Sequence, residues 1–174
     1  MGNNNAYCQD NHLSWVSWDL REEDEQFLGF VKTMVALRRN SAVFSGLKLV
    51  DDHYFGDQTL IQQVAWYHPD GHQLSDGDWN APVSQVFIMD IGDQKGKGER
   101  WLALFNASGY DIHYRLPKPA PGMMWQQVID TVASDGMPFL PDELKRLVAV
   151  GRAHSVKLLR QTICDGIDAC PPEL

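Results

Sequence analysis

The chain has 174 residues, of which 44% are hydrophobic and 22% are charged, and its formal net charge is -8. This composition is typical of a globular protein, and the length predicts one domain with a small appendage. The acidic charge argues against nucleic acid or an anionic membrane as the partner. No apolar run approaches the roughly 18 residues of a membrane span, and the first residues lack the basic and apolar regions of a signal peptide.

Asparagines are unusually dense at the start of the chain, in the segment GNNNAYCQDN that covers residues 2–11. Asn and Asp tolerate turn conformations and hydrogen-bond to their own main chain, so we expect an ordered polar loop. Side-chain amides both donate and accept hydrogen bonds, which suits recognition of a ligand rich in hydroxyl groups. The competing interpretation is a solvated loop that binds nothing.

A helix is predicted next, from about Asp19 to Arg39. Asp19 is placed to cap its start, with Glu22 in position for a capping box. Its apolar residues recur at helical spacing and form one broad face, which contains Phe27, Phe30, Val31, Met34, Val35 and Leu37. This face must fold onto the rest of the chain, contact a partner chain or a second copy, or remain exposed.

From about Leu47 the pattern changes to short apolar or alternating segments that are separated by turn-rich stretches. This pattern predicts a mainly β fold, an antiparallel β-sandwich. The predicted strands are Leu47–Val50, Ile61–Trp66, Val86–Ile91, Trp101–Asn106, Asp111–Leu116, Trp125–Asp130 and His154–Leu159. The residues from Thr162 to Leu174 are expected to form a loose tail.

Cysteine and histidine give little indication of a metal site. Three cysteines with wide spacing favour a reducing compartment, with free thiols as the expected state and pairing of Cys164 with Cys170 as the alternative. His68 and His72 have the spacing of metal ligands on a helix, but the proline and glycine between them exclude that helix. We interpret them as solvated turn histidines and predict no metal and no cofactor.

The six tryptophans raise the question of sugar stacking, because aromatic faces pack against the C–H groups of pyranose rings. Trp15, Trp18 and Trp101 are interpreted as core residues from their positions at a helix entry and at the start of an apolar strand. Trp79, in the turn-rich segment DGDW, is the best candidate for a surface aromatic residue.

Several segments resemble one known family. The run GNNNAYCQDN, with LSW and Trp18 after it, is similar to the passage from the last barrel strand to the last barrel helix in bacterial glycogen debranching enzymes and isoamylases of the α-amylase clan. Later segments resemble the same family in order: FVKTMVALRRNSAVF (Phe30–Phe44), WYHPDGHQLSDGDWNAP (Trp66–Pro82), WLALFNAS (Trp101–Ser108), YRLP (Tyr114–Pro117) and GRAHSVKLL (Gly151–Leu159). The resemblance covers nearly the whole chain except the tail.

The resemblance implies a division into three parts. Residues 1–44 would be the end of a catalytic (β/α)8 barrel, residues 45–161 a C-terminal antiparallel β-sandwich, and residues 162–174 a loose tail. In the family the Asn-rich loop lies near the substrate cleft, which makes five of its residues candidates for substrate binding: Asn4, Asn5, Tyr7, Asp10 and Asn11.

The function implied by the resemblance is hydrolysis of α-1,6-glucosidic branch linkages in glycogen or limit dextrin, with an α-glucan as partner and a cytoplasmic location. The catalytic carboxylates of the family lie on barrel strands that precede the Asn-rich loop, and their motifs are not found here. We therefore expect a fragment of a glycogen debranching enzyme that has no catalytic residues of its own. Two alternatives stay open: a glycan-binding β-module that acts alone, and the C-terminal half of a split glycoside hydrolase.

Overall fold

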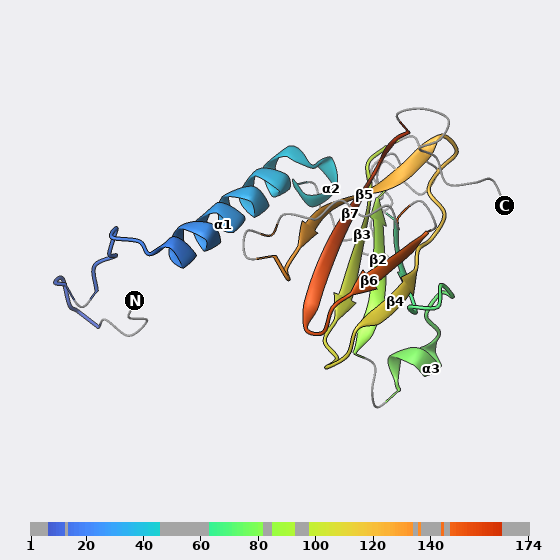
Figure 1. Cartoon of the computed structure of the whole chain (residues 1–174), viewed down its shortest axis with the longest axis horizontal. Helices are drawn as coiled ribbons and strands as arrows, with labels where there is room; N and C mark the ends of the chain where they lie inside the picture. Colours follow the sequence, from blue (N-terminus) through green and yellow to red (C-terminus); the bar gives the residue numbers. More distant parts are fainter. Residues whose placement is uncertain are drawn as a thin grey trace, which may run out of the picture.

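The computed structural model describes residues 7–12, 14–45, 63–81, 85–92, 98–133, 136, 144 and 147–164. Its elements in chain order are α1 (Glu22–Asn40), α2 (Ala42–Ser45), β1 (Gln63–Tyr67), α3 (Asp76–Trp79), β2 (Val86–Gly92), β3 (Arg100–Asn106), β4 (Ile112–Arg115), β5 (Met123–Asp130), β6 (Val148–Gly151) and β7 (Ser155–Ile163). Figure 1 shows the strands gathered into one body, with α1 and α2 on one side of it. The predicted mainly β, antiparallel fold class is confirmed.

The strands form two antiparallel sheets. Five of them pair in the order β1-β2-β3-β7-β5, and β4 pairs with β6 in a sheet of two. Strand β3 lies at the centre of the larger sheet, and its residues are buried on both faces. Central strands that are covered on both sides lose the alternation of apolar and polar residues, which explains the continuous apolar run in β3.

The main core lies between the two sheets. It consists of Ile88, Leu102, Leu104, Tyr114, Leu116, Trp125, Leu144, Ala149 and Leu159. The Tyr114 hydroxyl donates a hydrogen bond of 2.7 Å to the carbonyl oxygen of Phe105, so a β4 side chain is joined to the β3 backbone. A Cβ atom at Gly151 would lie 2.6 Å from the Tyr114 ring, so only glycine lets β6 approach that ring closely.

A second apolar cluster lies on the opposite face of the larger sheet. Its buried members are Val43, Ile91, Trp101, Ala103, Ile129 and Leu158. Helix α2 covers this end of the sheet, and the Phe44 and Trp101 rings lie 5.2 Å apart. The Glu99 carboxylate accepts hydrogen bonds from the Ser41 hydroxyl (2.9 Å) and the Val43 N–H (3.2 Å), which ties the α1–α2 junction to the sheet.

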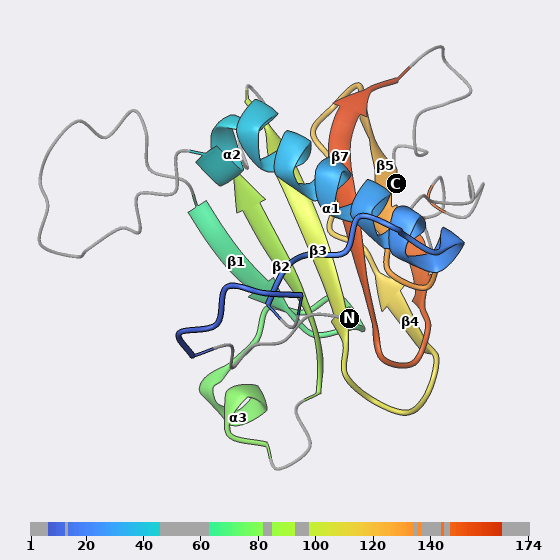
Figure 2. The ribbon, with the colours of Figure 1, turned by 90° about the vertical axis from the view of Figure 1, so that its left-hand side faces the viewer.

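Helix α1 passes in front of this face of the sheet in Figure 2 and slants away from it toward its N-terminal end in Figure 1, and none of its residues is completely buried. Phe30 and Leu37 pack partly against the second cluster. The remaining apolar residues of α1 are exposed: Phe27, Leu28, Val31, Met34 and Val35. The predicted apolar face is therefore divided between residues that contact the sheet and a stripe that no described residue covers.

The predicted start of the first helix, at about Asp19, is wrong, because α1 begins at Glu22. Arg21 is the N-cap, and the Asp24 carboxylate accepts a hydrogen bond from the Arg21 N–H (3.3 Å) and pairs with its guanidinium. Asp19 and Glu22 therefore do not form the predicted capping box. Helices α2 and α3 and strand β6 are not among the predicted elements.

The remaining strand predictions agree with the structure to within a few residues, although Leu47–Val50 lies outside the described residues. Strand β7 continues to Ile163, so the start of the predicted tail is paired in the sheet. Cys164 is in a disulfide bond, which corrects the expectation of a free thiol there, whereas Cys8 is free and exposed. Among the described residues, no helix has the length and hydrophobicity to span a membrane.

Candidate functional site

The predicted substrate-binding residues lie at the N-terminal end of the chain. Asn4 and Asn5 fall outside the described residues, and Tyr7 is exposed. Asp10 accepts a hydrogen bond of 2.8 Å from the Trp15 indole N–H, and the Asn11 side chain donates one of 2.9 Å to Gln9. These bonds are local to one turn. The role of these residues in substrate binding stays a prediction.

Two of the tryptophans that were interpreted as core are on the surface. Trp15 and Trp18 are 61% and 82% exposed, whereas Trp101 is buried as predicted. The segment before α1 extends away from the sheets (Figure 1). Its aromatic side chains therefore have no described element to pack against, which is the physical reason that the interpretation fails.

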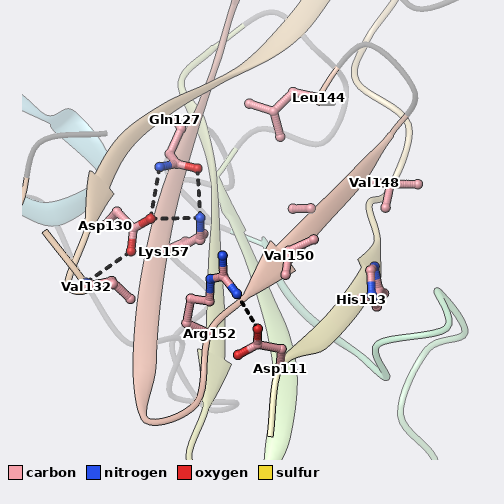
Figure 3. A pocket seen from close by; sticks show the side chains of 11 residues that line it. Asp111, His113, Gln127, Asp130, Val132, Leu144, Val148, Val150, Arg152 and Lys157 are labelled. Atoms are coloured by element: carbon pink, nitrogen blue, oxygen red, sulfur yellow. Dashed lines mark hydrogen bonds and ion pairs between the residues drawn. The ribbon is translucent and has the colours of Figure 1, made fainter. Parts of the chain in front are cut away.

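A cavity of about 600 Å³ lies beside the smaller sheet, next to β5 and β7. Figure 3 shows the side chains that line it, which come from β4, β5, β6, β7 and the adjoining loops. They are Asp111, His113, Gln127, Asp130, Val132, Leu144, Val148, Ala149, Val150, Arg152 and Lys157. Polar and charged groups lie along β5, β7 and the β6–β7 turn, and aliphatic groups come mainly from β6.

The charged groups in this cavity are paired with one another. The Lys157 ammonium lies 2.8 Å from the Asp130 carboxylate and donates a hydrogen bond of 3.4 Å to the Gln127 amide oxygen. Arg152 pairs with Asp111. Hydrogen bonds from the Arg152 guanidinium and the Ala153 N–H hold the pKa of Asp111 below its usual value.

This arrangement is poorly suited to glycoside hydrolysis. A retaining glycosidase uses two carboxyl groups about 5 Å apart, one of which stays protonated because its pKa is raised. In this cavity the pKa of Asp111 is lowered and not raised, and the Asp130 carboxylate is paired with the Lys157 ammonium. The groups can hydrogen-bond to a polar ligand, but they do not form a general acid.

A cluster of aromatic rings lies across β1, β2, β3 and α3, and we call it the aromatic cluster: Trp66, Trp79, Phe87 and Phe105. Trp66 meets Trp79 edge to face at 5.4 Å and Phe87 at 5.5 Å. Trp79 ends α3 and is 46% exposed, so the prediction that it lies at the surface is confirmed. The Ser75 hydroxyl and the Asp78 carboxylate cap α3 and thereby position this ring.

The segment His68-Pro69-Asp70-Gly71-His72 forms a tight turn after β1, which we call the His–Asp turn. The His68 N–H donates to the His72 carbonyl (2.8 Å), and Gly71 has φ of 98°, which favours glycine. The two imidazole rings stack with centroids 4.8 Å apart. The prediction that both histidines lie in a turn is confirmed, and the turn also stacks their rings, which the comparison with helical metal-ligand spacing did not anticipate. The Pro-Asp-Gly turn signal could have indicated this pairing.

Carboxylates surround the two histidines. The Asp70 Oδ1 atom lies 2.6 Å from His72 Nδ1 and 3.1 Å from His68 Nδ1, and Asp78 Oδ2 lies 3.3 Å from His72 Nε2. Hydrogen bonds that the His72 ring donates to the Asp78 and Asp70 carboxylates raise the pKa of His72. Hydrogen bonds from Ser75 and His72 lower the pKa of Asp78 to about 2.

Comparison with known proteins identifies a family that the chain matches. The family described as "Isoamylase, C-terminal" matches residues 63–151, which run from β1 to β6. The chain is 28% identical over 162 residues to the "Glycogen debranching enzyme" of Yersinia enterocolitica, covering 92% of this chain and 20% of that protein. It is 30% identical over 157 residues to "Isoamylase 1, chloroplastic" of Oryza sativa, covering 90% and 17% respectively.

A further relative is the "Glycogen operon protein GlgX homolog" of Mycobacterium tuberculosis, with 27% identity over 140 residues, 75% of this chain and 19% of that protein. The chain thus spans about a fifth of the length of these curated relatives. The region matched by the family contains every strand except β7 and all residues of the main core except Leu159. The chain belongs to the isoamylase C-terminal family and is homologous to glycogen debranching enzymes.

Proposed function

We propose that this chain is the C-terminal part of a glycogen debranching enzyme and supports a catalytic barrel without performing catalysis itself. The reaction of the whole enzyme would be hydrolysis of α-1,6-glucosidic branch linkages in glycogen or limit dextrin. The observation that carries the proposal is the family match over the two-sheet domain, together with relatives named as debranching enzymes and isoamylases. The ion-paired carboxylates of the described cavity support a role without acid catalysis.

Helix α1 is the element through which the domain would support the barrel. Its exposed apolar stripe adjoins Phe30 and Leu37, which contact the second core cluster. A helix whose apolar face is broader than its contact with one body is expected to pack against a second body as well. In this proposal residues 1–44 complete a barrel, residues 45–161 form the domain that holds its last helix, and the Asn-rich loop reaches the substrate cleft.

A chimera tests the proposal. The chain would replace the matching segment of the Yersinia enterocolitica glycogen debranching enzyme, over 162 aligned residues. We expect the chimera to release reducing sugar from phosphorylase limit dextrin, and the chain alone to release none above a matched blank. Turnover by the chain alone would show that its own carboxylates form a site. A chimera that is folded by circular dichroism but inactive would refute the supporting role.

The exposed stripe of α1 provides a more specific prediction. Val31 is 39% exposed, so Val31→Asp should change the free energy of unfolding of the isolated chain by no more than about 0.5 kcal/mol, the usual limit for surface substitutions. In the chimera the same change would bury an unpaired charge against the barrel, and we expect at least about a tenfold loss of activity.

Lys32→Asp is the matched control, because it places the same residue one position along the exposed side of α1. Unfolding in urea and debranching rates would be measured for both variants. Equal activity of the two chimeras would show that the stripe does not contact the barrel.

A second candidate function is α-glucan binding by the aromatic cluster, and the half-exposed Trp79 ring favours it. We expect Trp79→Ala to weaken retardation of the chain in glycogen-containing gels at least about fivefold, equivalent to about 1 kcal/mol of stacking. Trp18→Ala is the control, since Trp18 is exposed but lies outside the cluster. Two results would exclude this function. The first is an equal loss of retardation in both variants, and the second is an unmodified chain that glycogen does not retard.

A further inference from the structure

The donor atoms of the His–Asp turn converge on one point. One ligand atom from each of His68, Asp70 and His72 lies within 4.8 Å of the other two, and Asp70 Oδ1 lies 3.1 Å from His68 Nδ1 and 2.6 Å from His72 Nδ1. Tetrahedral zinc with bonds of about 2.0–2.2 Å places its ligand atoms roughly 3.3–3.5 Å apart. Both observed nitrogen–oxygen separations are shorter than that value, so small rotations of the side chains that widen them would bring all three atoms into coordination.

From this geometry we propose that His68, Asp70 and His72 form a binding site for a divalent transition-metal ion of the zinc type. Two imidazoles and one carboxylate suit zinc, whereas magnesium and calcium prefer a set made of oxygen atoms. Three protein ligands leave a fourth position for water, as in open zinc sites. The site is independent of the debranching function proposed above.

Asp78 provides a second observation that points to a metal. Its Oδ2 atom lies 3.3 Å from His72 Nε2, on the side of the ring opposite to Asp70. A carboxylate that accepts the Nε2–H proton leaves the Nδ1 lone pair directed at the proposed metal position. The same Asp78 oxygen accepts hydrogen bonds from the Ser75 N–H (2.8 Å) and the Ser75 hydroxyl (2.6 Å), so it is held in place.

The backbone of the turn is already organised for binding. Two hydrogen bonds close it, from the His68 N–H to His72 and from the Gly71 N–H to His68. The ion would replace the contact between Asp70 Oδ1 and His72 Nδ1 and the hydrogen bond of 3.3 Å from the Asp70 N–H to His68 Nδ1. Since all three ligands are at the surface, we expect a dissociation constant on the order of 10 μM.

The test uses the full chain without a histidine tag and with Cys8→Ser, since the exposed Cys8 thiol could also bind zinc. Calorimetric titration with zinc chloride at about pH 7.5, where most histidines are neutral, should show one equivalent bound. His68→Ala and His72→Ala should each weaken binding at least about tenfold, and Asp78→Asn by about tenfold, which is typical of a lost outer-shell partner. His12→Ala and His113→Ala are the controls and should leave binding unchanged.

Protons should compete with the metal at this site. His72 faces Asp70, Asp78 and the stacked His68 ring. Zinc affinity should therefore fall when the pH is lowered to about 5.5, because imidazole must be neutral to bind a metal. In the same titrations, the NMR signals of the His68 and His72 rings should shift, and those of His12 and His113 should not.

Three results would overturn the proposal. The first is a dissociation constant weaker than about 1 mM, which would be ordinary surface association. The second is binding that survives His72→Ala unchanged, and the third is a loss of binding with His12→Ala equal to that with His72→Ala. Circular dichroism of each variant would confirm that the sheets stay folded, so that loss of affinity reports on the ligands.

Discussion

Replacing Asp90 with asparagine is expected to lower the free energy of unfolding by about 3–5 kcal/mol, because it leaves a buried guanidinium without its counter-charge. Asp90 is completely buried and Arg100 is 6% exposed. The two form a bidentate pair, with Arg100 Nε 2.9 Å from Asp90 Oδ1 and Nη2 2.6 Å from Oδ2. Arg100 also donates to the Lys118 carbonyl, so it is held in this position.

Urea unfolding, followed by circular dichroism, measures this effect. The double variant Asp90→Leu/Arg100→Met should be more stable than Asp90→Asn, since removing both charges removes their desolvation cost as well. Asp111→Asn is the control, because it breaks the exposed pair with Arg152 and should have a much smaller effect. If Asp90→Asn lowered the free energy of unfolding as little as Asp111→Asn does, the buried pair would not be needed for stability.

The second large effect is expected at Trp125, where substitution by alanine should cost about 3–5 kcal/mol. The Trp125 side chain is fully buried between the two sheets. Its indole N–H donates a hydrogen bond of 2.8 Å to the Pro117 carbonyl, and the Arg100 guanidinium lies 5.1 Å from the ring centroid. Alanine would create a cavity and also remove both polar contacts.

Trp125→Phe separates these contributions, because it keeps most of the apolar volume. We expect a cost of about 1–2 kcal/mol for this variant, from the lost hydrogen bond and the weaker cation–π contact. Trp18→Ala, at an exposed position, should change stability by less than about 0.5 kcal/mol. Equal losses for Trp125→Ala and Trp125→Phe would mean that the polar contacts, and not core volume, determine the stability at this position.

Most strands could be predicted from sequence, because a strand with a buried face shows a short apolar or alternating pattern. Val86–Gly92 and Arg100–Asn106 are examples, and the turn-rich segments between strands marked their ends. Strand β6 was missed because its four residues, VAVG, are too short to show a period. In β5, a bulge between Gln127 and Ile129 breaks the alternation, so Trp125 and Ile129 lie in different cores.

The candidate sites were harder to predict. Trp79 was correctly predicted to lie at the surface, because the residues next to it in the sequence are typical of turns. Trp15 and Trp18 were wrongly predicted to be core residues. Their burial depends on which element packs against them, and the neighbouring residues in the sequence do not show this. His68 and His72 were correctly predicted to lie in a turn, but their pairing was missed because i,i+4 spacing was judged by helical geometry, whereas a hairpin places the same two positions side by side.

The sequence alone indicated the family, through the resemblance of its extended motifs, and the mainly β antiparallel fold, through its local hydrophobic patterning. Only the tertiary structure decided which charges neutralise one another. Asp90 meets Arg100 across the β2–β3 hairpin, and Asp111 meets Arg152 from a distant part of the chain. Such pairings depend on strand register and on how the two sheets pack, and the same packing leaves one stripe of α1 exposed.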